Sequence, residues 1–289
     1  MVPGAGFPLQ TINQMEVLQN ANFGMRIQHI LNDQSKRENF IKVNQSFRPH
    51  VVIFNNRHWE PGSFTEFQAN RFHFLEGAVD PIKFAPSSYK KFPGPNEKKI
   101  IGGLANKNPM PLINAIRQLP DNYELRLFGI FGDLADTSAE LINMEKLKLL
   151  GRLNDETLPT FYKEVDCVVH TESFAGWANI AAEALACGIP LICTQNGTLA
   201  FARDAETAHI ISKITPEEIA KALTNIFQNH NMALKLSYEG RKTIAEYSWE
   251  KYSSELIRIM NFDLRVHYLY APEYGFYGKW PLETRLNEV

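Results

Sequence analysis

Residues 165 to 198 hold the side chains whose types and spacing are best suited to bind an anionic ligand. The stretch reads VDCVVHTESFAGWANIAAEALACGIPLICTQNGT, where a β-branched run is followed by a polar loop with Gly176 and then by an alanine-rich segment carrying Glu183. That order predicts a buried strand, a glycine-bearing loop and a helix. Because the free N–H groups and the dipole at a helix start favour negative charge, we expect an anion such as a phosphate there.

Strands and helices alternate through residues 93–262, around this stretch and on both sides of it. Alternation of this type predicts a doubly wound parallel sheet with right-handed crossovers. Ligands of such sheets bind at the carboxyl ends of the strands, so the chemistry should lie in the loops that follow them. The expected strands are 99–101, broken by Gly102-Gly103, then 123–129, 147–151, 165–170, 191–194 and 209–212, and the expected helices are 111–119, 157–164, 178–186 and one that begins with Thr215 as N-cap and Pro216 at its first position.

The stretch resembles the donor-nucleotide site of retaining GT-B glycosyltransferases of the family-4 type. Gly176, Asn179 and the run from Glu183 to Pro190, EALACGIP, match the family's pattern. The resemblance implies that Glu183 binds the ribose of a nucleoside-diphosphate sugar. The family's first Glu, which contacts the transferred sugar, corresponds to Ala175 here, and Glu172 is the carboxylate that could take its place if the loop bulges.

Other loops also resemble the family. The segment from Ile100 to Lys107 is similar to a loop whose Arg and Lys neutralise the leaving diphosphate; Lys107 fits the Lys, while Gly103 stands where the Arg is expected. The turn at Gln195 to Thr198 resembles one whose amides face the phosphates, and Leu150 to Leu153 resembles the segment that holds the base through its backbone.

The resemblance therefore implies a set of site residues. No metal ligand is expected, because the sequence has no Asp-x-Asp motif. The expected catalytic residues are Lys107 and Glu172, and the expected donor-binding residues are Gly102, Gly103, Arg152, Leu153, Gly176, Asn179, Glu183, Gly197 and Thr198.

The expected fold is a GT-B-like α/β fold whose N-terminal half is reduced. A complete first half usually needs about 150 residues or more, and the sequence divides into a shorter acceptor-side Rossmann-like domain, a nucleotide-sugar-binding Rossmann-like domain and a tail that packs back on the first part. Either the acceptor domain is minimal, or part of it comes from a second subunit, from self-association or from sequence not present here. The three parts are 1–92, 93–262 and 263–289, and the elements expected in the first are helices 10–21 and 36–46, strands 26–31, 51–54 and 72–75, a connector at 77–81 and an acceptor-facing loop at 55–60.

Composition excludes several classes of protein. The formal net charge of −2 gives no basic field of the kind that nucleic-acid binders use. We find neither an apolar run long enough for a transmembrane helix nor a signal peptide, so a cytoplasmic location is expected. The three cysteines, Cys167, Cys187 and Cys193, lie in apolar contexts and are expected to be buried free thiols.

Two classes of function remain open. The first is a metal-independent, retaining glycosyltransferase that needs no cofactor and uses a UDP or GDP sugar as donor and a glycan, lipid or small molecule as acceptor. The second is a non-catalytic or partial GT-B protein that binds a nucleotide or a partner subunit. The segment around Glu183 favours the first class, whereas Ala175, Gly103 and the short N-terminal half favour the second.

Overall fold

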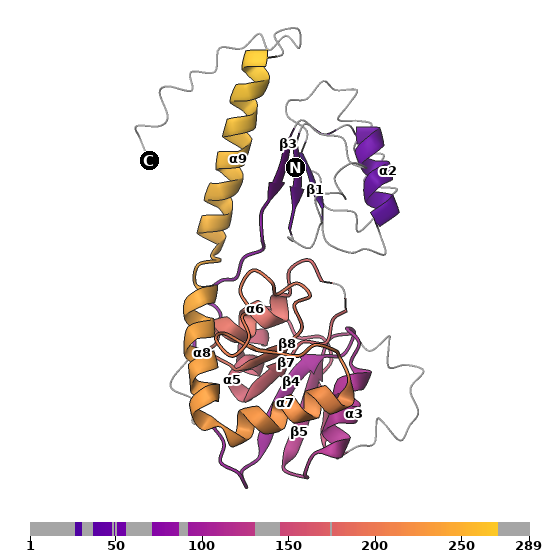
Figure 1. The fold of residues 1–289 in the computed structure, drawn as a ribbon, viewed down its shortest axis with the longest axis vertical. Helices are drawn as coiled ribbons and strands as arrows, with labels where there is room; N and C mark the ends of the chain where they lie inside the picture. Colours follow the sequence, from indigo (N-terminus) through magenta and orange to yellow (C-terminus); the bar gives the residue numbers. More distant parts are fainter. Residues whose placement is uncertain are drawn as a thin grey trace.

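Two parallel β-sheets organise the described part of the chain, which comprises residues 27–30, 37–47, 49, 51–55, 71–86, 92–130, 145–173 and 175–270 of a computed structural model. In Figure 1 the smaller sheet lies above the larger one, and helices flank both. The prediction of an α/β fold with parallel sheets is confirmed.

The larger sheet contains six parallel strands in the order β6-β5-β4-β7-β8-β9. The order grows outward from β4 in one direction and from β7 in the other, which is the doubly wound arrangement with a switch point between these two strands. The strands are β4 Lys99–Leu104, β5 Tyr123–Phe128, β6 Leu147–Leu149, β7 Cys167–Val169, β8 Leu191–Cys193 and β9 His209–Ile210.

Helices cover both faces of this sheet because its strands are apolar on both sides. Helices α3 (Met110–Gln118) and α7 (Pro216–Gln228) pack on one face, and α5 (Leu158–Glu164) and α6 (Asn179–Ala186) pack on the other. Helix α8 (His230–Ile244) contacts both α6 and α7. The predicted start of α7 is confirmed, since Thr215 Oγ1 accepts from the Glu218 amide and Pro216 takes the first position.

The predicted break of the first strand at Gly102-Gly103 is wrong. Strand β4 runs unbroken through both glycines to Leu104, and both lie buried in the sheet rather than in a phosphate loop. The reason is packing: a Cβ at Gly102 would lie 2.9 Å from Phe161 Cζ, and a Cβ at Gly103 would lie 2.7 Å from Leu112 Cδ2. The glycines allow the side chains of α5 and α3 to approach the backbone of the strand.

The smaller sheet has the parallel order β1-β2-β3, with β2 in the middle. The ends of the observed elements of this half each lie within one residue of the expected ends. Helix α2 lies beside the sheet in Figure 1. The expected helix 10–21 and residues 56–60 of the expected acceptor loop lie outside the described residues. The elements are β1 Ile27–Ile30, α2 Arg37–Phe47, β2 Val51–Phe54 and β3 Arg71–Phe74.

Helix α9 (Trp249–Tyr270) links the two halves. Its Ile259 packs with Val51, Ile53 and Leu75 of the smaller sheet's side, and Figure 1 shows the helix rising along that sheet. The amide of Val79, in the connector, donates to the Tyr247 carbonyl oxygen at 2.8 Å. The two segments that join the halves, the connector and the chain just before α9, therefore run side by side. Among the described helices none combines the length and the apolar character needed to cross a bilayer.

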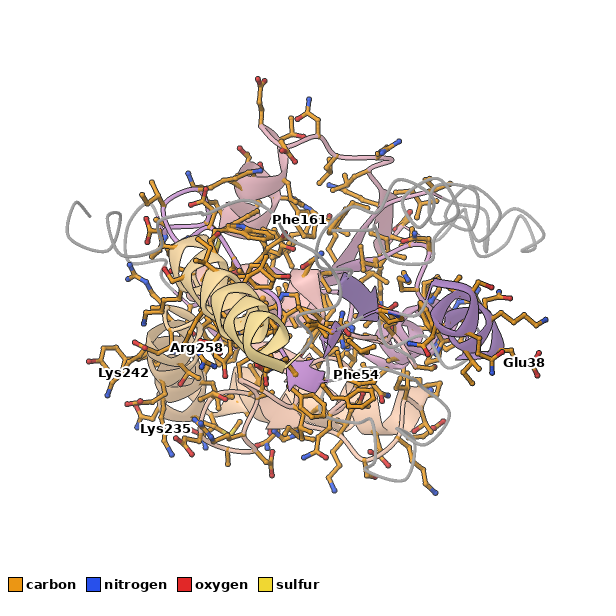
Figure 2. The ribbon with its side chains drawn as sticks, turned by 90° about the horizontal axis from the view of Figure 1, so that it is seen from above. Glu38, Phe54, Phe161, Lys235, Lys242 and Arg258 are labelled. Atoms are coloured by element: carbon orange, nitrogen blue, oxygen red, sulfur yellow. The ribbon has the colours of Figure 1, made fainter. Side chains whose placement is uncertain are left out.

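The expected boundary at residue 262 falls inside α9, and residues 271–289 of the expected tail lie outside the described residues. Viewed from above in Figure 2, Lys235, Lys242 and Glu38 point away from the protein at its edge, whereas Phe54 and Phe161 lie in the interior. The three cysteines are free and buried, as the sequence predicts.

The glycine at position 103 gives a test of the packing under α3. A Gly103→Ala variant should lose about 1 to 3 kcal/mol of unfolding free energy, because the new methyl group overlaps Leu112 and Leu127. Urea denaturation of a Gly94→Ala variant is the matched control, since a Cβ there meets its nearest neighbour, Glu97 Oε2, at 3.6 Å. Equal stability of the two variants would contradict the packing explanation.

Candidate functional site

The loops after β4 and β7 meet at the switch point of the larger sheet. These strands are hydrogen-bonded neighbours, and their chains continue to α3 on one face and to α6 on the other. Because the loops leave in opposite directions, the carboxyl edge between them is where a doubly wound sheet binds its ligand. Lys107 lies in the first loop and Glu172 in the second.

Two contacts join these loops. Lys107 Nζ lies 2.6 Å from Glu172 Oε1, and Thr171 Oγ1 donates to the Lys107 carbonyl oxygen at 2.8 Å. The Lys107 side chain is 44% exposed and that of Glu172 is 18% exposed, so the pair sits at the edge of the protein with the cation facing outward. The two residues expected to be catalytic are therefore brought together, although 65 positions separate them in the sequence.

His170 stands behind this pair at the end of β7. Its side chain is 1% exposed, and Nε2 lies 3.7 Å from Glu172 Oε2, which is longer than a hydrogen bond. Neither ring nitrogen has a hydrogen-bond partner among the described residues. Burial alone would raise the pKa of Glu172, but His170 and Lys107 together hold the pKa of that carboxyl below its ordinary value. The sequence analysis did not select His170; the signal was an ionisable residue directly after the apolar run from Cys167 to Val169.

The loop that leads into α6 packs against the turn after β8. Gly197 has a φ of +70°, and the amide of Ala178 donates to its carbonyl oxygen at 2.9 Å. A Cβ at Gly197 would lie 2.5 Å from Ala175 Cβ, so glycine is needed both for the turn and for this contact. Ala175 is buried, and a glutamate at that position would have to displace the turn.

Thr198 contributes to the shape of this turn. Its hydroxyl donates to the Thr194 carbonyl oxygen at 2.5 Å and its amide to the Gln195 carbonyl oxygen at 3.4 Å. The side chain is fully buried, so it stabilises the turn from inside. Asn179, by contrast, is exposed at the first position of α6.

Glu183 lies in the middle of α6, on the side that faces α5. Its Oε2 accepts a hydrogen bond from Tyr162 Oη at 2.7 Å. Burial raises the pKa of Glu183 to about 7, against the opposing effects of the Tyr162 hydroxyl and of the Lys83 cation. This carboxyl can therefore exist in its neutral or its charged form near neutral pH, and a ligand hydroxyl could bond to it in either form.

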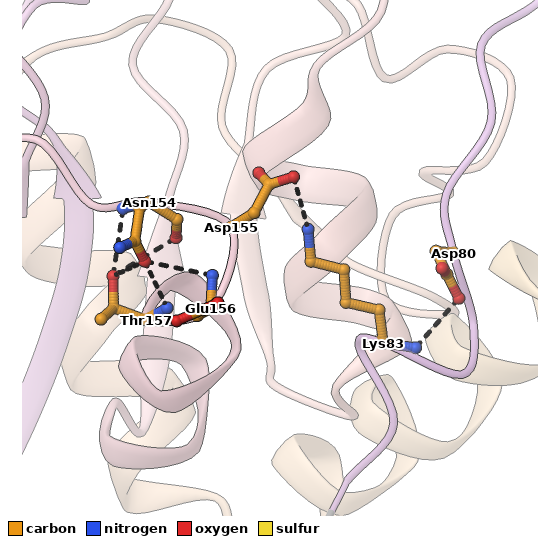
Figure 3. A network of polar contacts seen from close by, with 6 residues as sticks. All are labelled: Asp80, Lys83, Asn154, Asp155, Glu156 and Thr157. Atoms are coloured by element: carbon orange, nitrogen blue, oxygen red, sulfur yellow. Dashed lines mark hydrogen bonds and ion pairs between the residues drawn. The ribbon is translucent and has the colours of Figure 1, made fainter.

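A polar network positions the segment expected to hold a base. Figure 3 shows Lys83, just after the connector, reaching Asp155 with a Nζ–Oδ2 distance of 3.3 Å, while Asp80 Oδ1 accepts from the Lys83 amide. Asn154 Oδ1 accepts from the amides of Glu156 and Thr157, which fixes the loop before α5. Just before this network, Arg152 is exposed and Leu153 packs against the core on the α6 side.

A small pocket lies where the loop before α6 meets the N-terminal half. The Asn55 side chain approaches Gly176 so closely that a Cβ there would lie 2.4 Å from Asn55 Nδ2. Trp177 packs on Phe201 with ring centroids 4.9 Å apart, and its ring leaves no room for a Cβ at Gly77 of the connector. The pocket is lined by Asn55, Glu76, Gly176, Trp177, Gly197, Leu199 and Ala200.

A larger cavity of about 340 Å³ lies at the other edge of the sheet, where β4 and β5 begin. Its Glu124 carboxylate already pairs with Lys98, Arg126 and Lys148, which hold the pKa of that group at about 2 in spite of its burial. The switch-point loops do not line this cavity. The described residues contain no group of three or more His, Cys, Asp or Glu side chains placed to hold a metal ion.

Comparison with known proteins points to one family. The family model described as "Glycosyl transferases group 1" matches residues 90–243. An uncharacterized glycosyltransferase of Methanocaldococcus jannaschii is 24% identical over 141 residues, which are 48% of this chain and 40% of that protein. A D-inositol 3-phosphate glycosyltransferase of Salinispora arenicola is 24% identical over 127 residues, 44% of this chain and 28% of that protein. The chain thus matches less than half the length of these curated relatives.

Solved structures show the same fold. Anabaena Alr3699/HepE, in complex with UDP-glucose, has a TM-score of 0.74 at 15% identity, with 87% of this chain and 76% of that chain covered. Sucrose-phosphate synthase from Thermosynechococcus elongatus has a TM-score of 0.69 at 17% identity, with 87% and 71% covered. The predicted GT-B-like fold class is confirmed.

The raised pKa of Glu183 makes stability depend on pH. A carboxyl that holds its proton more tightly when folded stabilises the protein below its ordinary pKa, and this stabilisation is lost as pH rises through about 7. At about 1.4 kcal/mol per pKa unit, Glu183 should contribute up to about 3 kcal/mol to the difference in stability between pH 5 and pH 8.

A Glu183→Gln variant keeps an acceptor for Tyr162 but does not titrate, so its stability should fall less between these pH values. Urea denaturation of both proteins at pH 5 and pH 8 measures this. If the variant and the wild type differ by the same amount at both pH values, Glu183 is not the titrating group.

Proposed function

The chain belongs to the glycosyl transferases group 1 family, and we propose that it is a glycosyltransferase that moves a sugar from a nucleoside-diphosphate sugar to a glycan, lipid or small-molecule acceptor. The observation that carries the proposal is the Lys107–Glu172 pair, which joins the two loops of the switch point. A cation at that edge of a doubly wound sheet is suited to a diphosphate.

In this proposal the phosphates lie between Lys107 and the turn after β8. Lys107 supplies the positive charge, and the Gly197 amide supplies a backbone donor, since the Thr198 amide is used within the turn. Glu172 holds Lys107 in place and is the nearest carboxylate to the transferred sugar. Gly176 leaves room for the Asn55 side chain beside the loop before α6. Asn179 presents its amide at the start of α6.

The nucleoside would then lie toward α5 and α6. Glu183 accepts from the ribose hydroxyls, with Tyr162 keeping the carboxyl oriented. The backbone of Arg152 and Leu153 holds the base, and the Lys83–Asp155 pair steadies that segment from the connector side. In this proposal the residues for the phosphates and those for the nucleoside come from different loops and helices around one sheet.

The proposed reaction is retaining and needs neither a metal nor a cofactor. The bond between the anomeric carbon and the leaving phosphate oxygen breaks, and its electron pair stays on the diphosphate. The acceptor hydroxyl oxygen forms the new bond on the same face, and its proton passes to that phosphate oxygen. Lys107 and the turn amide stabilise the negative charge that develops on the phosphate, which is the main requirement for catalysis here.

The donor and the acceptor are proposed as chemical classes. A UDP or GDP sugar is the proposed donor; a UDP-glucose complex is known for the similar Anabaena protein. The acceptor is proposed to bind on the side of the domain of residues 1–92, which a second subunit or self-association would complete. A reducing compartment such as the cytoplasm fits the three free thiols.

A second candidate function rests on Ala175. Its methyl group packs against Gly197, so this position lacks the carboxylate that the resemblance assigns to sugar contact. A protein that binds the nucleotide without transferring a sugar would show this arrangement. Calorimetry with UDP, GDP, ADP and their glucose conjugates, followed by a hydrolysis assay of each binder, separates the two: binding with turnover supports the transferase, binding without turnover supports the second function, and no binding contradicts both.

Glu183 gives a direct test of the nucleoside part. A charge-assisted hydrogen bond contributes about 1.5 to 3 kcal/mol, so Glu183→Ala should weaken binding of the best nucleotide by roughly tenfold or more. Glu217→Ala is the matched control, because it removes an exposed carboxylate on α7, away from the proposed nucleoside site. Calorimetry should show near wild-type affinity for that control. Unchanged affinity in a folded Glu183→Ala protein would place the ribose elsewhere.

A further inference from the structure

The imidazole of His170 is one of two buried side chains, among the residues that the structure describes, whose polar atoms lack hydrogen-bond partners; the other is the indole of Trp177. Both imidazole nitrogens are buried, and neither has a hydrogen-bond partner among the described residues. The backbone amide of the same residue, in contrast, donates to the Ile192 carbonyl oxygen at 2.9 Å, so the residue is fixed in the sheet. A buried polar atom without a partner costs stability, and such a group in a functional site calls for an explanation.

The charged group beside His170 is the Glu172 carboxylate, through the oxygen that Lys107 does not contact. Lys107 Nζ contacts Oε1 at 2.6 Å, whereas Oε2 lies 3.7 Å from His170 Nε2. A small shift of the carboxylate would bring Oε2 within hydrogen-bond range of the imidazole. The carboxylate therefore stands between two groups that can each carry a positive charge.

The net charge of the site determines whether Glu172 pairs with Lys107 or with His170. With a neutral imidazole, Lys107 and Glu172 cancel, and the site has no net charge to offer a ligand. The diphosphate of a nucleotide sugar brings two negative charges and competes with Glu172 for Lys107. A proton on His170 would supply the missing positive charge, because the imidazolium can then pair with Glu172 in place of Lys107.

We propose that His170 takes up a proton when the donor diphosphate binds and then pairs with Glu172, which releases the charge of Lys107 to the phosphates. This inference rests on the proposed function. The proton comes from the buffer and returns to it when the nucleotide leaves, so none is consumed in the cycle. His170 is thus a positioning residue, acting on the ligand through Glu172 and Lys107.

The surroundings of His170 support this assignment. Among the described residues, Glu172 on its own loop is the charged group that faces it, and Lys107 on the loop after β4 pairs with that carboxylate. From β8, the other neighbour of β7, the titratable group is the thiol of Cys193, whose pKa burial raises to about 12, so it stays neutral. The end of β4 contributes Leu104 and Ala105, which do not titrate.

The test is the number of protons taken up on binding. The nucleoside-diphosphate glucose that binds tightest among the UDP, GDP and ADP forms is titrated at pH 7 in two buffers of different ionisation enthalpy. Its diphosphate is a diester and does not titrate near neutral pH, so the difference between the two apparent enthalpies counts protons of the protein. Glu183 also titrates near pH 7 and belongs to the proposed nucleoside site, so the titration is carried out in a Glu183→Gln background. We expect net proton uptake on binding in that background.

Variants identify the group that takes up the proton. In the Glu183→Gln background, His170→Asn should abolish the uptake. Glu172→Gln removes the carboxylate that would pair with the imidazolium, so it should abolish the uptake as well. It serves as the test if His170→Asn does not fold. His230→Gln is the control, since His230 is exposed at the start of α8 and should leave the uptake unchanged.

Binding of the ligand without proton uptake in the Glu183→Gln background overturns the inference and leaves the proposed function standing. Uptake that persists when His170→Asn is added to that background, in a folded protein, also overturns it. If none of the nucleotide sugars binds, the proposed function fails and the inference falls with it.

Discussion

The reversal of strand order between β4 and β7 is the constraint on which the rest of the site depends. Because the chain leaves β4 toward α3 on one face and leaves β7 toward α6 on the other, the loops diverge and the carboxyl edge between them stays accessible. Residues far apart in the sequence then meet there, and the Thr171 hydroxyl ties the two loops together. Close packing below this edge, with glycines in β4 under α3 and α5, keeps the loops at a fixed separation.

Much of this could be predicted from local sequence. Apolar runs of strand length, alternating with helices that begin at Thr215 or end before Gly188, are sufficient to predict a doubly wound sheet. The run from Glu183 to Pro190 places an acidic residue on a short helix after a glycine loop, and the structure has that helix. The pairing of Lys107 with Glu172 follows once the strand order is known, since their loops adjoin.

The remaining features depend on contacts between distant residues, which local patterns do not record. A glycine pair suggests a strand break when read alone, yet at Gly102 and Gly103 it provides the space into which Phe161 and Leu112 pack. Tyr162 bonds Glu183 across 21 positions, and burial rather than sequence sets the pKa of that carboxyl at about 7. Ala175 looks like a lost contact in the sequence, whereas in the structure its methyl group fills the space beside Gly197.

The central claim is that the switch point binds the diphosphate through Lys107. The most direct measurement is the calorimetric affinity for the best nucleoside diphosphate relative to its monophosphate, in the wild type and in Lys107→Ala, with the exposed Lys221→Ala as control. The account predicts that the wild type and the control prefer the diphosphate and that Lys107→Ala loses roughly tenfold or more of this preference. An unchanged preference in folded Lys107→Ala would contradict it.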